Sequence, residues 1–178
     1  MLKVAQVGLG WWGAQVTNVL QGSEKIEVIC GVDPIAQIAE KYTADFGLPV
    51  YSDYQDALDD PKVEGVILTI PHRLHEDMLL RAVAAGKQVF CEKPLVLATN
   101  ELDSIIGAVR RTSGVLMVGF NRRWAPAVEQ AIDFVGRGTP IQIIYRIHAG
   151  ALPDTHWLRD RRQGGRLLGE ACHFVDTC

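Results

Sequence analysis

A glycine pattern near the N-terminus constrains the fold of this chain more than any other feature. Gly8, Gly10 and Gly13 follow the apolar run Val4–Gly8 and open a helical pattern over Trp12–Leu20. This Gly-x-Gly-x-x-Gly spacing permits a tight turn, a close approach of backbone to a pyrophosphate, and close packing of a helix on a strand. The pattern therefore predicts a strand, a turn and a helix that together bind a dinucleotide.

The following residues alternate short apolar runs with helical patterns, which is typical of a parallel sheet covered by helices on both faces. Further strands are expected at Ile26–Val32, Val63–Ile70, Val89–Cys91 and Val115–Phe120. Helices are expected at Ile35–Phe46, Asp53–Leu58, Leu74–Ala85 and Thr99–Arg110. We therefore expect an α/β fold in which residues 1–121 form a doubly wound Rossmann domain with a parallel sheet of about six strands.

The pattern changes after this unit, and residues 122–178 are expected to begin a second α/β domain with an open sheet. Its predicted elements are a helix, a half-buried strand, a glycine loop and a further helix, at Val128–Val135, Ile141–His148, Gly164-Gly165 and Leu167–Val175. The last pattern reaches Cys178 without a stop signal, so a truncated second domain is expected. An apolar strand face without partners predicts a homo-oligomer, or disorder after about residue 150.

Composition excludes several classes of protein. The chain has 48% hydrophobic and 22% charged residues, as expected of a soluble globular protein, and no apolar run approaches the ~20 residues that span a bilayer. A net charge of -3 gives no indication of nucleic-acid binding. The cysteines are scattered, without zinc spacing, so free thiols and no metal site are expected. A cytoplasmic protein without membrane or nucleic-acid partners follows as the expectation.

Asp33 favours NAD as the cofactor, with NADP as the less favoured alternative. It follows Gly13 by about 20 residues, at the end of the second predicted strand, where a carboxylate accepts hydrogen bonds from the adenosine ribose. Pro34–Gln37 offer no cation for a 2′-phosphate. The N–H groups near Trp11 and Trp12 are expected to meet the phosphates. A glycine turn without ligand is the alternative, and Asp33 argues against it.

A second set of candidate cofactor contacts lies where the strand Val63–Ile70 gives way to its helix. The backbone and hydroxyl of Thr69 are expected to contact the nicotinamide half, next to Pro71. His72 and His75 are further candidates. The alternative for these two is a histidine at a helix N-cap and a histidine on the surface.

Glu92-Lys93-Pro94 closes the strand Val89–Cys91 and places a lysine at a strand end. Open α/β sheets bind ligands in the crevice beyond such ends, so Lys93 can face a cofactor and a substrate together. Such a lysine can exchange a proton with a substrate hydroxyl. His173 is the candidate for a second acid/base group. An ordinary surface lysine and a structural histidine are the alternatives.

Four arginines lie beside Gly164-Gly165, namely Arg159, Arg161, Arg162 and Arg166. A solvated loop is one interpretation of this cluster. The other is an edge that recognises a carboxylate or phosphate on an acidic substrate, because guanidinium forks suit both groups.

Together these motifs resemble the Gfo/Idh/MocA family of glucose–fructose oxidoreductase and inositol dehydrogenase, over essentially the whole chain. The resemblance is carried by the glycine pattern, Asp33, Thr69-Ile70-Pro71, Glu92-Lys93-Pro94, Gly119-Phe120-Asn121-Arg122-Arg123-Trp124, Gly164-Gly165 and His173-Phe174-Val175-Asp176. It implies NAD(P)-dependent oxidation or reduction of sugars, cyclitols or sugar derivatives. It also implies that Lys93 and His173 are catalytic and that Glu92 and Asn121 lie near the nicotinamide.

The sequence departs from the family pattern at Gly169, where the family often has Asp four residues before the histidine. Glu170 stands one residue later, and a one-residue shift on a helix rotates a side chain by roughly 100°. Members of the family are also considerably longer. These departures keep open a non-catalytic sensor or partner-binding module. A third alternative is NAD-assisted hydrolysis of glycosides, which begins with the same oxidation.

Overall fold

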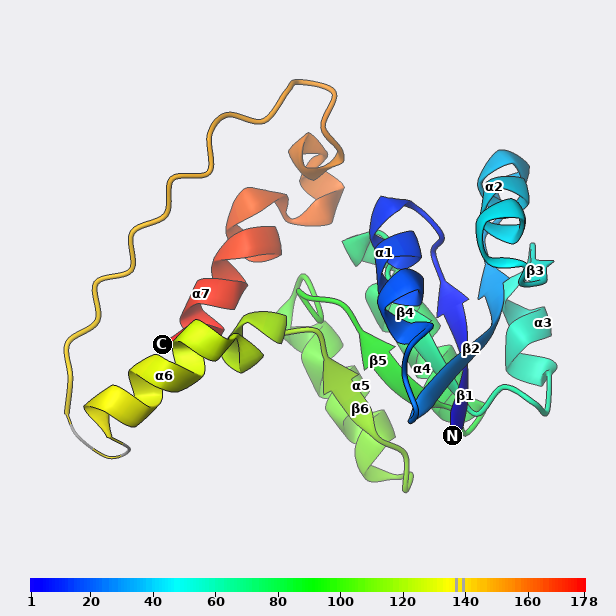
Figure 1. Ribbon diagram of the computed structural model, residues 1–178, viewed down its shortest axis with the longest axis horizontal. Helices are drawn as coiled ribbons and strands as arrows, with labels where there is room; N and C mark the ends of the chain where they lie inside the picture. The colour runs from blue at the N-terminus through cyan, green and yellow to red at the C-terminus, as the bar shows by residue number, and fades with distance from the viewer. Residues whose placement is uncertain (137, 139) are drawn as a thin grey trace.

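The computed structural model describes residues 1–136, 138 and 140–178 (Figure 1). Within these residues, six parallel strands form one sheet in the order β3-β2-β1-β4-β5-β6. The strands are β1 (Leu2–Val7), β2 (Ile26–Val32), β3 (Val50–Tyr51), β4 (Gly65–Leu68), β5 (Gln88–Cys91) and β6 (Leu116–Val118). The strand order reverses between β1 and β4, which is the doubly wound Rossmann arrangement. The predicted fold class is confirmed.

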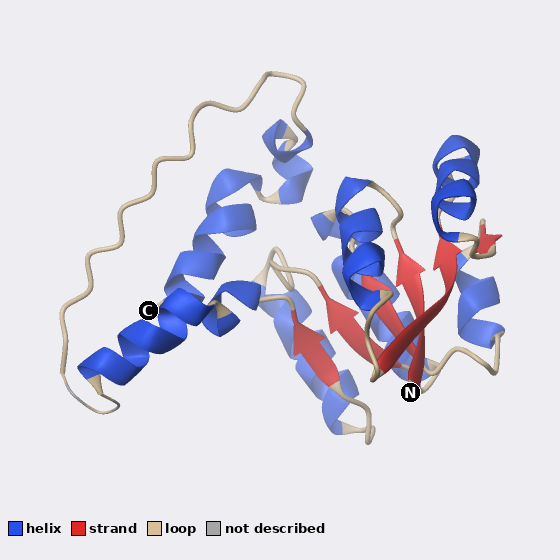
Figure 2. Cartoon of the chain, in the orientation of Figure 1, coloured by secondary structure: helices blue, strands red, loops and turns tan. Residues whose placement is uncertain are grey.

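Seven α-helices occur in the described residues. They are α1 (Trp11–Leu20), α2 (Ala36–Phe46), α3 (Tyr54–Asp59), α4 (His75–Ala84), α5 (Thr99–Arg110), α6 (Pro126–Val135) and α7 (Cys172–Thr177). Figure 2 shows helices on both faces of the sheet, with α1 in front and α4 and α5 behind. Two of these helices have capping residues, since Gly47 ends α2 at φ 69° and the Asp53 side chain accepts from Gln55 N at the start of α3.

The core lies between the sheet and its helices. The central strands are apolar on both faces, as a sheet covered on both sides requires. Ala5 of β1 and Leu68 of β4 are fully buried, and Leu79 of α4 and Ile105 of α5 pack against the sheet in the same cluster. Parallel register sets Val7 opposite Leu68, so β1 and β4 end at the same edge of the sheet. That edge carries the candidate site.

Beyond β6 the described residues add short helices and no strand. The short helical turns beyond β6 are η2 (Asn121–Trp124), η3 (Trp157–Arg159), η4 (Arg161–Gln163) and η5 (Leu167–Ala171), and a further one, η1 (His72–Leu74), lies between β4 and α4. The predicted helix at Leu167–Val175 is present in two parts, because η5 is a π-helical turn that runs into α7. No helix of the described residues is both long and apolar enough to cross a bilayer.

The prediction of a strand at Ile141–His148 is wrong for this structure. The segment is an extended trace on the outside of the molecule, drawn in orange in Figure 1, and no described strand pairs with it. A strand forms only when its N–H and C=O groups find a neighbouring strand. The alternating apolar side chains are consequently exposed, namely Ile141, Ile143, Ile144, Tyr145 and Ile147.

Candidate functional site

The glycine turn after β1 has the geometry that its spacing predicts. Gly8 has φ +81°, and a Cβ atom there would lie 2.5 Å from the carbonyl oxygen of Thr69. A Cβ atom on Gly13 would lie 2.0 Å from the carbonyl oxygen of Gly8, so this glycine lets α1 pack against the turn. A Cβ atom on Gly10 would meet no described heavy atom within 4 Å.

The open space at Gly10 lies at the start of α1. Gly10 is the N-cap of this helix, and no side chain of the described residues caps it, so the first N–H groups at Trp11 and Trp12 are left to a ligand or to water. A helix N-terminus with free N–H groups and room for backbone contact is suited to an anion. The residues present therefore fit the pyrophosphate of a dinucleotide.

Thr69 holds the glycine turn from beneath. Its hydroxyl donates to the carbonyl oxygen of Gly8 at 2.7 Å and accepts from Gln6 Nε2 at 2.7 Å. The hydroxyl proton is used inside the protein, and one lone pair remains for a donor. The contact of Thr69 to the nicotinamide half therefore stays a prediction. Gln6 is fully buried and was not predicted as a site residue. The signal for it is a polar residue within the otherwise apolar run Val4–Val7.

Asp33 links the end of β2 to the glycine turn. Its Oδ2 accepts from Leu9 N and its Oδ1 from Ile35 N, both at 3.0 Å, and the residue is buried. Each carboxylate oxygen keeps a further lone pair for a ribose hydroxyl. The side chain thus stands where the sequence predicts an adenosine contact and also fixes the turn that would hold the phosphates.

The two histidines after β4 face the protein interior. His75 is fully buried, with Nδ1 2.8 Å from Pro94 O and Nε2 3.0 Å from Ile70 O, so the surface alternative is wrong. With both ring nitrogens on backbone carbonyls, a cofactor contact by His75 is not supported. Pro71 precedes His72 as the N-cap of η1.

His72 packs against the C-terminal segment. Its Nδ1 lies 2.8 Å from Gln163 O, and its ring meets Trp157 edge-on at 4.9 Å. Burial lowers the pKa of His72 to about 4, so the ring is neutral at neutral pH. His72 thus connects the segment after β4 to Gln163 in η4. Motifs that are local in sequence do not predict such a contact.

Lys93 lies near the helical turn that carries His173, although the two residues are 80 positions apart in the chain. Lys93 Nζ donates to the carbonyl oxygen of Gly169 at 2.8 Å, one helical turn before His173. His173 is buried in α7, its ring is edge-on to Phe120, and its Nδ1 has no hydrogen-bond partner among the described residues. Burial, followed by the charges of Lys93 and Arg122, lowers the pKa of His173 to about 4. The site thus pairs an ammonium donor with a neutral imidazole.

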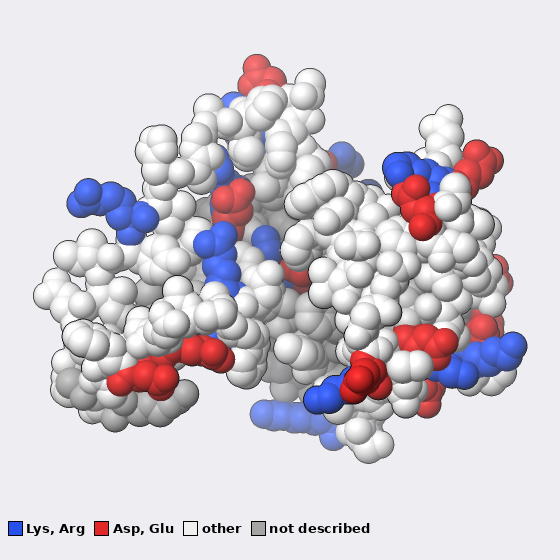
Figure 3. All heavy atoms as spheres, viewed as in Figure 1, with Lys and Arg blue, Asp and Glu red and all other residues white. Residues whose placement is uncertain are grey.

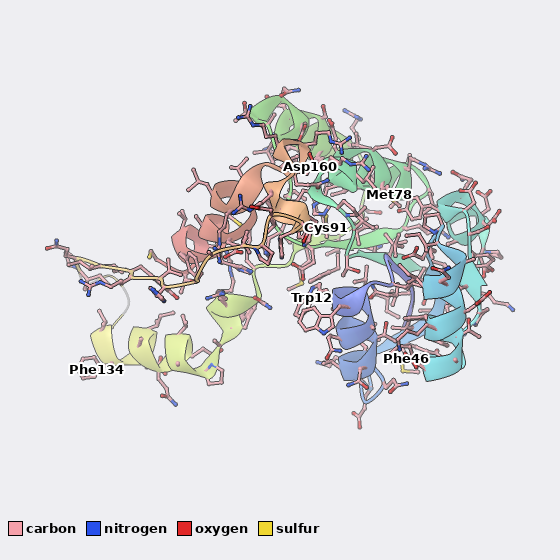
Figure 4. All side chains as sticks on the ribbon, turned by 90° about the horizontal axis from the view of Figure 1, so that it is seen from above. Trp12, Phe46, Met78, Cys91, Phe134 and Asp160 are labelled. Carbon is pink, nitrogen blue, oxygen red and sulfur yellow. The ribbon has the colours of Figure 1, made fainter. Side chains whose placement is uncertain are left out.

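Glu92 completes this group. Its Oε1 accepts from Trp12 Nε1 at 2.8 Å, and its Oε2 accepts from Lys93 N at 3.1 Å. Figure 4 shows the Trp12 side chain leaving the start of α1 on the side of the C-terminal segment. Asn121 begins η2 just after β6 and is exposed. The strand ends of β5 and β6 therefore present these predicted residues at one edge.

Gly169 explains how the departure from the family pattern is accommodated. A Cβ atom there would lie 3.0 Å from His72 Cε1 and 3.0 Å from Leu158 Cδ2, so an aspartate would force these side chains apart. Glu170 is directed to Arg166, with Oε2 3.3 Å from Nε. The Lys93 ammonium therefore meets a backbone carbonyl in place of a carboxylate.

The arginine cluster is mostly engaged within its own segment. Arg159 pairs with Asp154 at 3.1 Å, Arg162 with Asp160 at 2.8 Å, and Arg166 with Glu170. Figure 3 shows basic and acidic atoms next to one another in the hollow near the middle of this face of the molecule. The solvated-loop interpretation is supported for these three side chains, and recognition of an acidic substrate by them is not.

Comparison with known proteins now decides the family. The family model described as "Oxidoreductase family, NAD-binding Rossmann fold", GFO_IDH_MocA, matches residues 2–120. The chain belongs to the Gfo/Idh/MocA family. It is 34% identical over 180 residues to a scyllo-inositol 2-dehydrogenase (NAD(+)) of Bacillus subtilis, covering 98% of this chain and 52% of the relative. The chain thus spans about half the length of the curated relatives that it matches.

Similar solved structures agree with the fold. GenD2 from gentamicin A biosynthesis, in complex with NAD, superposes with a TM-score of 0.87 at 28% identity, covering 99% of this chain and 52% of that one. KijD10, a 3-ketoreductase from Actinomadura kijaniata in complex with NADP, superposes with a TM-score of 0.71 at 25% identity, covering 75% and 41%. Both nicotinamide cofactors therefore occur among similar structures.

Proposed function

We propose that this chain carries the cofactor site and the acid/base pair of an NAD(P)-dependent oxidoreductase. Its substrate would be a carbinol of a sugar, a cyclitol or a sugar derivative. The observation that supports this most directly is the hydrogen bond from Lys93 Nζ to Gly169 O, one helical turn before His173. The neighbouring Glu92 is in turn bonded to Trp12 at the start of α1. In this proposal residues 1–121 are the cofactor domain, and residues 122–178 belong to a substrate and oligomerisation domain of a cytoplasmic homo-oligomer.

A bound nicotinamide supplies the hydride chemistry. The side chains of this chain then have to move one proton and hold one oxygen atom. The Lys93 ammonium donates a hydrogen bond to the substrate oxygen, since its present partner is a carbonyl that substrate oxygen can replace. The neutral His173 imidazole accepts the hydroxyl proton, which its lowered pKa permits at neutral pH.

NAD is the proposed cofactor in preference to NADP. Asp33 stands at the end of β2 with its carboxylate on the glycine turn, where a 2′-phosphate would meet a like charge. The neighbouring residues Pro34–Gln37 carry no cation that could neutralise it. Titration of the chain with both nucleotides tests this preference, and equal or tighter binding of NADP would refute it.

A non-catalytic dinucleotide-binding module is the second candidate. Gly169 favours it, because the Lys93 ammonium faces a carbonyl where the family pattern often has a carboxylate. The two candidates are separated by incubating the chain with NAD and a panel of inositols, aldoses, sugar acids and sugar nucleotides while following NADH absorbance. Reduction of NAD with one substrate class supports the enzyme. Binding of NAD without reduction on any member of the panel supports the module.

A further inference from the structure

Glu92 is a buried acidic residue at the junction of three strand ends. Its backbone N–H donates to Leu68 O of β4 at 3.0 Å, and the preceding Cys91 O accepts from Gly119 N beyond β6 at 2.8 Å. The residue is only 9% exposed. A charged side chain in such a place needs hydrogen-bond donors of its own, because water cannot solvate it fully.

Two N–H donors and one glycine fix the Glu92 carboxylate in position. The Trp12 indole donates to Oε1 at 2.8 Å, and the Lys93 backbone donates to Oε2 at 3.1 Å. A Cβ atom on Gly119 would lie 2.9 Å from the carboxylate carbon, so this glycine provides the space that the group occupies. N–H groups are the partners that an ionised carboxylate accepts from, and none of these contacts uses Glu92 as a donor.

This charge lies on the half of the sheet that takes the second nucleotide. The glycine turn follows β1 and Asp33 follows β2, so the pyrophosphate and the adenosine belong to that half. In a doubly wound sheet the dinucleotide crosses the switch point, and its other nucleotide lies over the strands on the far side. Glu92 ends β5 on that side, and its partner Trp12 stands in the pyrophosphate turn.

We propose that Glu92 selects the oxidised form of the cofactor. Its fixed carboxylate stabilises the positively charged ring of oxidised nicotinamide and gives no such stabilisation to the neutral reduced ring. This inference rests on the proposed function. The nearby Lys93 ammonium acts in the opposite sense, but its Nζ donates to Gly169 O at 2.8 Å. Asp33 lies at the adenosine end and does not distinguish the two rings.

The test compares the affinities for NAD and for NADH by calorimetric titration of the chain. Glu92→Gln keeps the shape and removes the charge. We expect it to weaken NAD binding by about 10-fold while NADH binding changes by less than about 2-fold, as an unscreened charge near the ring requires. Trp12→Phe removes the indole donor and part of the ring but keeps the Glu92 charge, and it should reduce the preference for NAD by a smaller factor. Glu64→Gln is the matched control, because Glu64 also accepts from a backbone N–H, that of Lys3, at the opposite edge of the sheet.

The outcomes separate two claims, namely the selection of the oxidised cofactor by Glu92 and the proposed oxidoreductase function. Equal losses of NAD and NADH affinity in Glu92→Gln overturn the inference and leave the proposed function standing. An unmutated chain that binds neither nucleotide overturns both. If thermal unfolding shows that Glu92→Gln is not folded, Trp12→Phe takes its place in the test. A ratio of NAD affinity to NADH affinity in Trp12→Phe equal to that of the unmutated chain then overturns the inference.

Discussion

Alanine at Gly10 and alanine at Gly13 should have opposite consequences, although the two positions lie in one turn. At Gly13 the new Cβ would sit 2.0 Å from Gly8 O and 2.8 Å from Thr69 Oγ1, so backbone must move. Such overpacking typically costs about 1–3 kcal/mol. For a chain of this size that corresponds to a fall of roughly 2–12 °C in the midpoint of thermal unfolding.

At Gly10 the new Cβ meets no heavy atom of the described chain within 4 Å, so the fold should tolerate it. Replacing a glycine N-cap by alanine costs about 0.5–1 kcal/mol, which is less than the cost expected at Gly13. The same methyl group would occupy the space that a pyrophosphate needs, and we expect NAD affinity to fall at least about 10-fold, equivalent to about 1.4 kcal/mol.

Calorimetry measures both quantities on the same samples, by scanning for stability and by titration for affinity. The unmutated chain and Gly22→Ala serve as controls, since a Cβ on Gly22 also meets no neighbour within the described residues and lies away from the turn. A Gly10→Ala protein that binds NAD normally would refute the assignment of the open space to the pyrophosphate. A Gly13→Ala protein of normal stability would refute the packing argument.

Three further predictions concern the cofactor, the histidines and the exposed segment. Asp33→Asn should narrow the gap between NAD and NADP affinity by about 10-fold, as removal of one charge near the 2′ position requires; an unchanged gap in titrations would contradict it. Burial lowers the pKa of His72 and His173 to about 4, so both bind protons more readily when unfolded. The stability that these groups contribute is present above pH 6.5 and is lost as pH falls toward 4. Between these pH values, the midpoint of thermal unfolding of His72→Gln should therefore depend less on pH than that of the unmutated chain. Ile144 is 81% exposed, and Ile144→Lys should reduce the self-association measured by light scattering, whereas a monomeric unmutated chain would refute that expectation.

The Rossmann sheet could be predicted from sequence because its signals are local. Strand and helix periodicity, the glycine spacing and the caps at Gly47 and Asp53 each depend on a few neighbouring residues. The strand β3 (Val50–Tyr51) cannot be predicted in this way, since two residues are too few to show the alternation of apolar and polar side chains. The strand prediction at Ile141–His148 is wrong for a different reason. Alternating apolar residues are typical of a strand, but they do not show whether a neighbouring strand is present to pair with it.

The site could be predicted as a set of residues but not as a set of contacts. Lys93 and His173 are separated by 80 positions in sequence, and only the fold brings the lysine to the turn before the histidine. The inward placement of His72 and His75 depends on Gln163 and on Pro94, which local patterns do not connect to them. The bond from Trp12 to Glu92 is likewise a product of tertiary structure.

The central claim is that Lys93 and His173 carry the proton chemistry, and one measurement tests it most directly. Turnover and NAD affinity are compared for Lys93→Ala, His173→Ala and Glu170→Ala, with the substrate class identified by the panel. Acid/base groups typically contribute about 10²–10⁴-fold, so the first two variants should lose turnover by that factor and keep their NAD affinity. Glu170→Ala should lose less, because its carboxylate faces Arg166. Near-normal turnover in Lys93→Ala, or a larger loss in Glu170→Ala than in His173→Ala, would contradict the account.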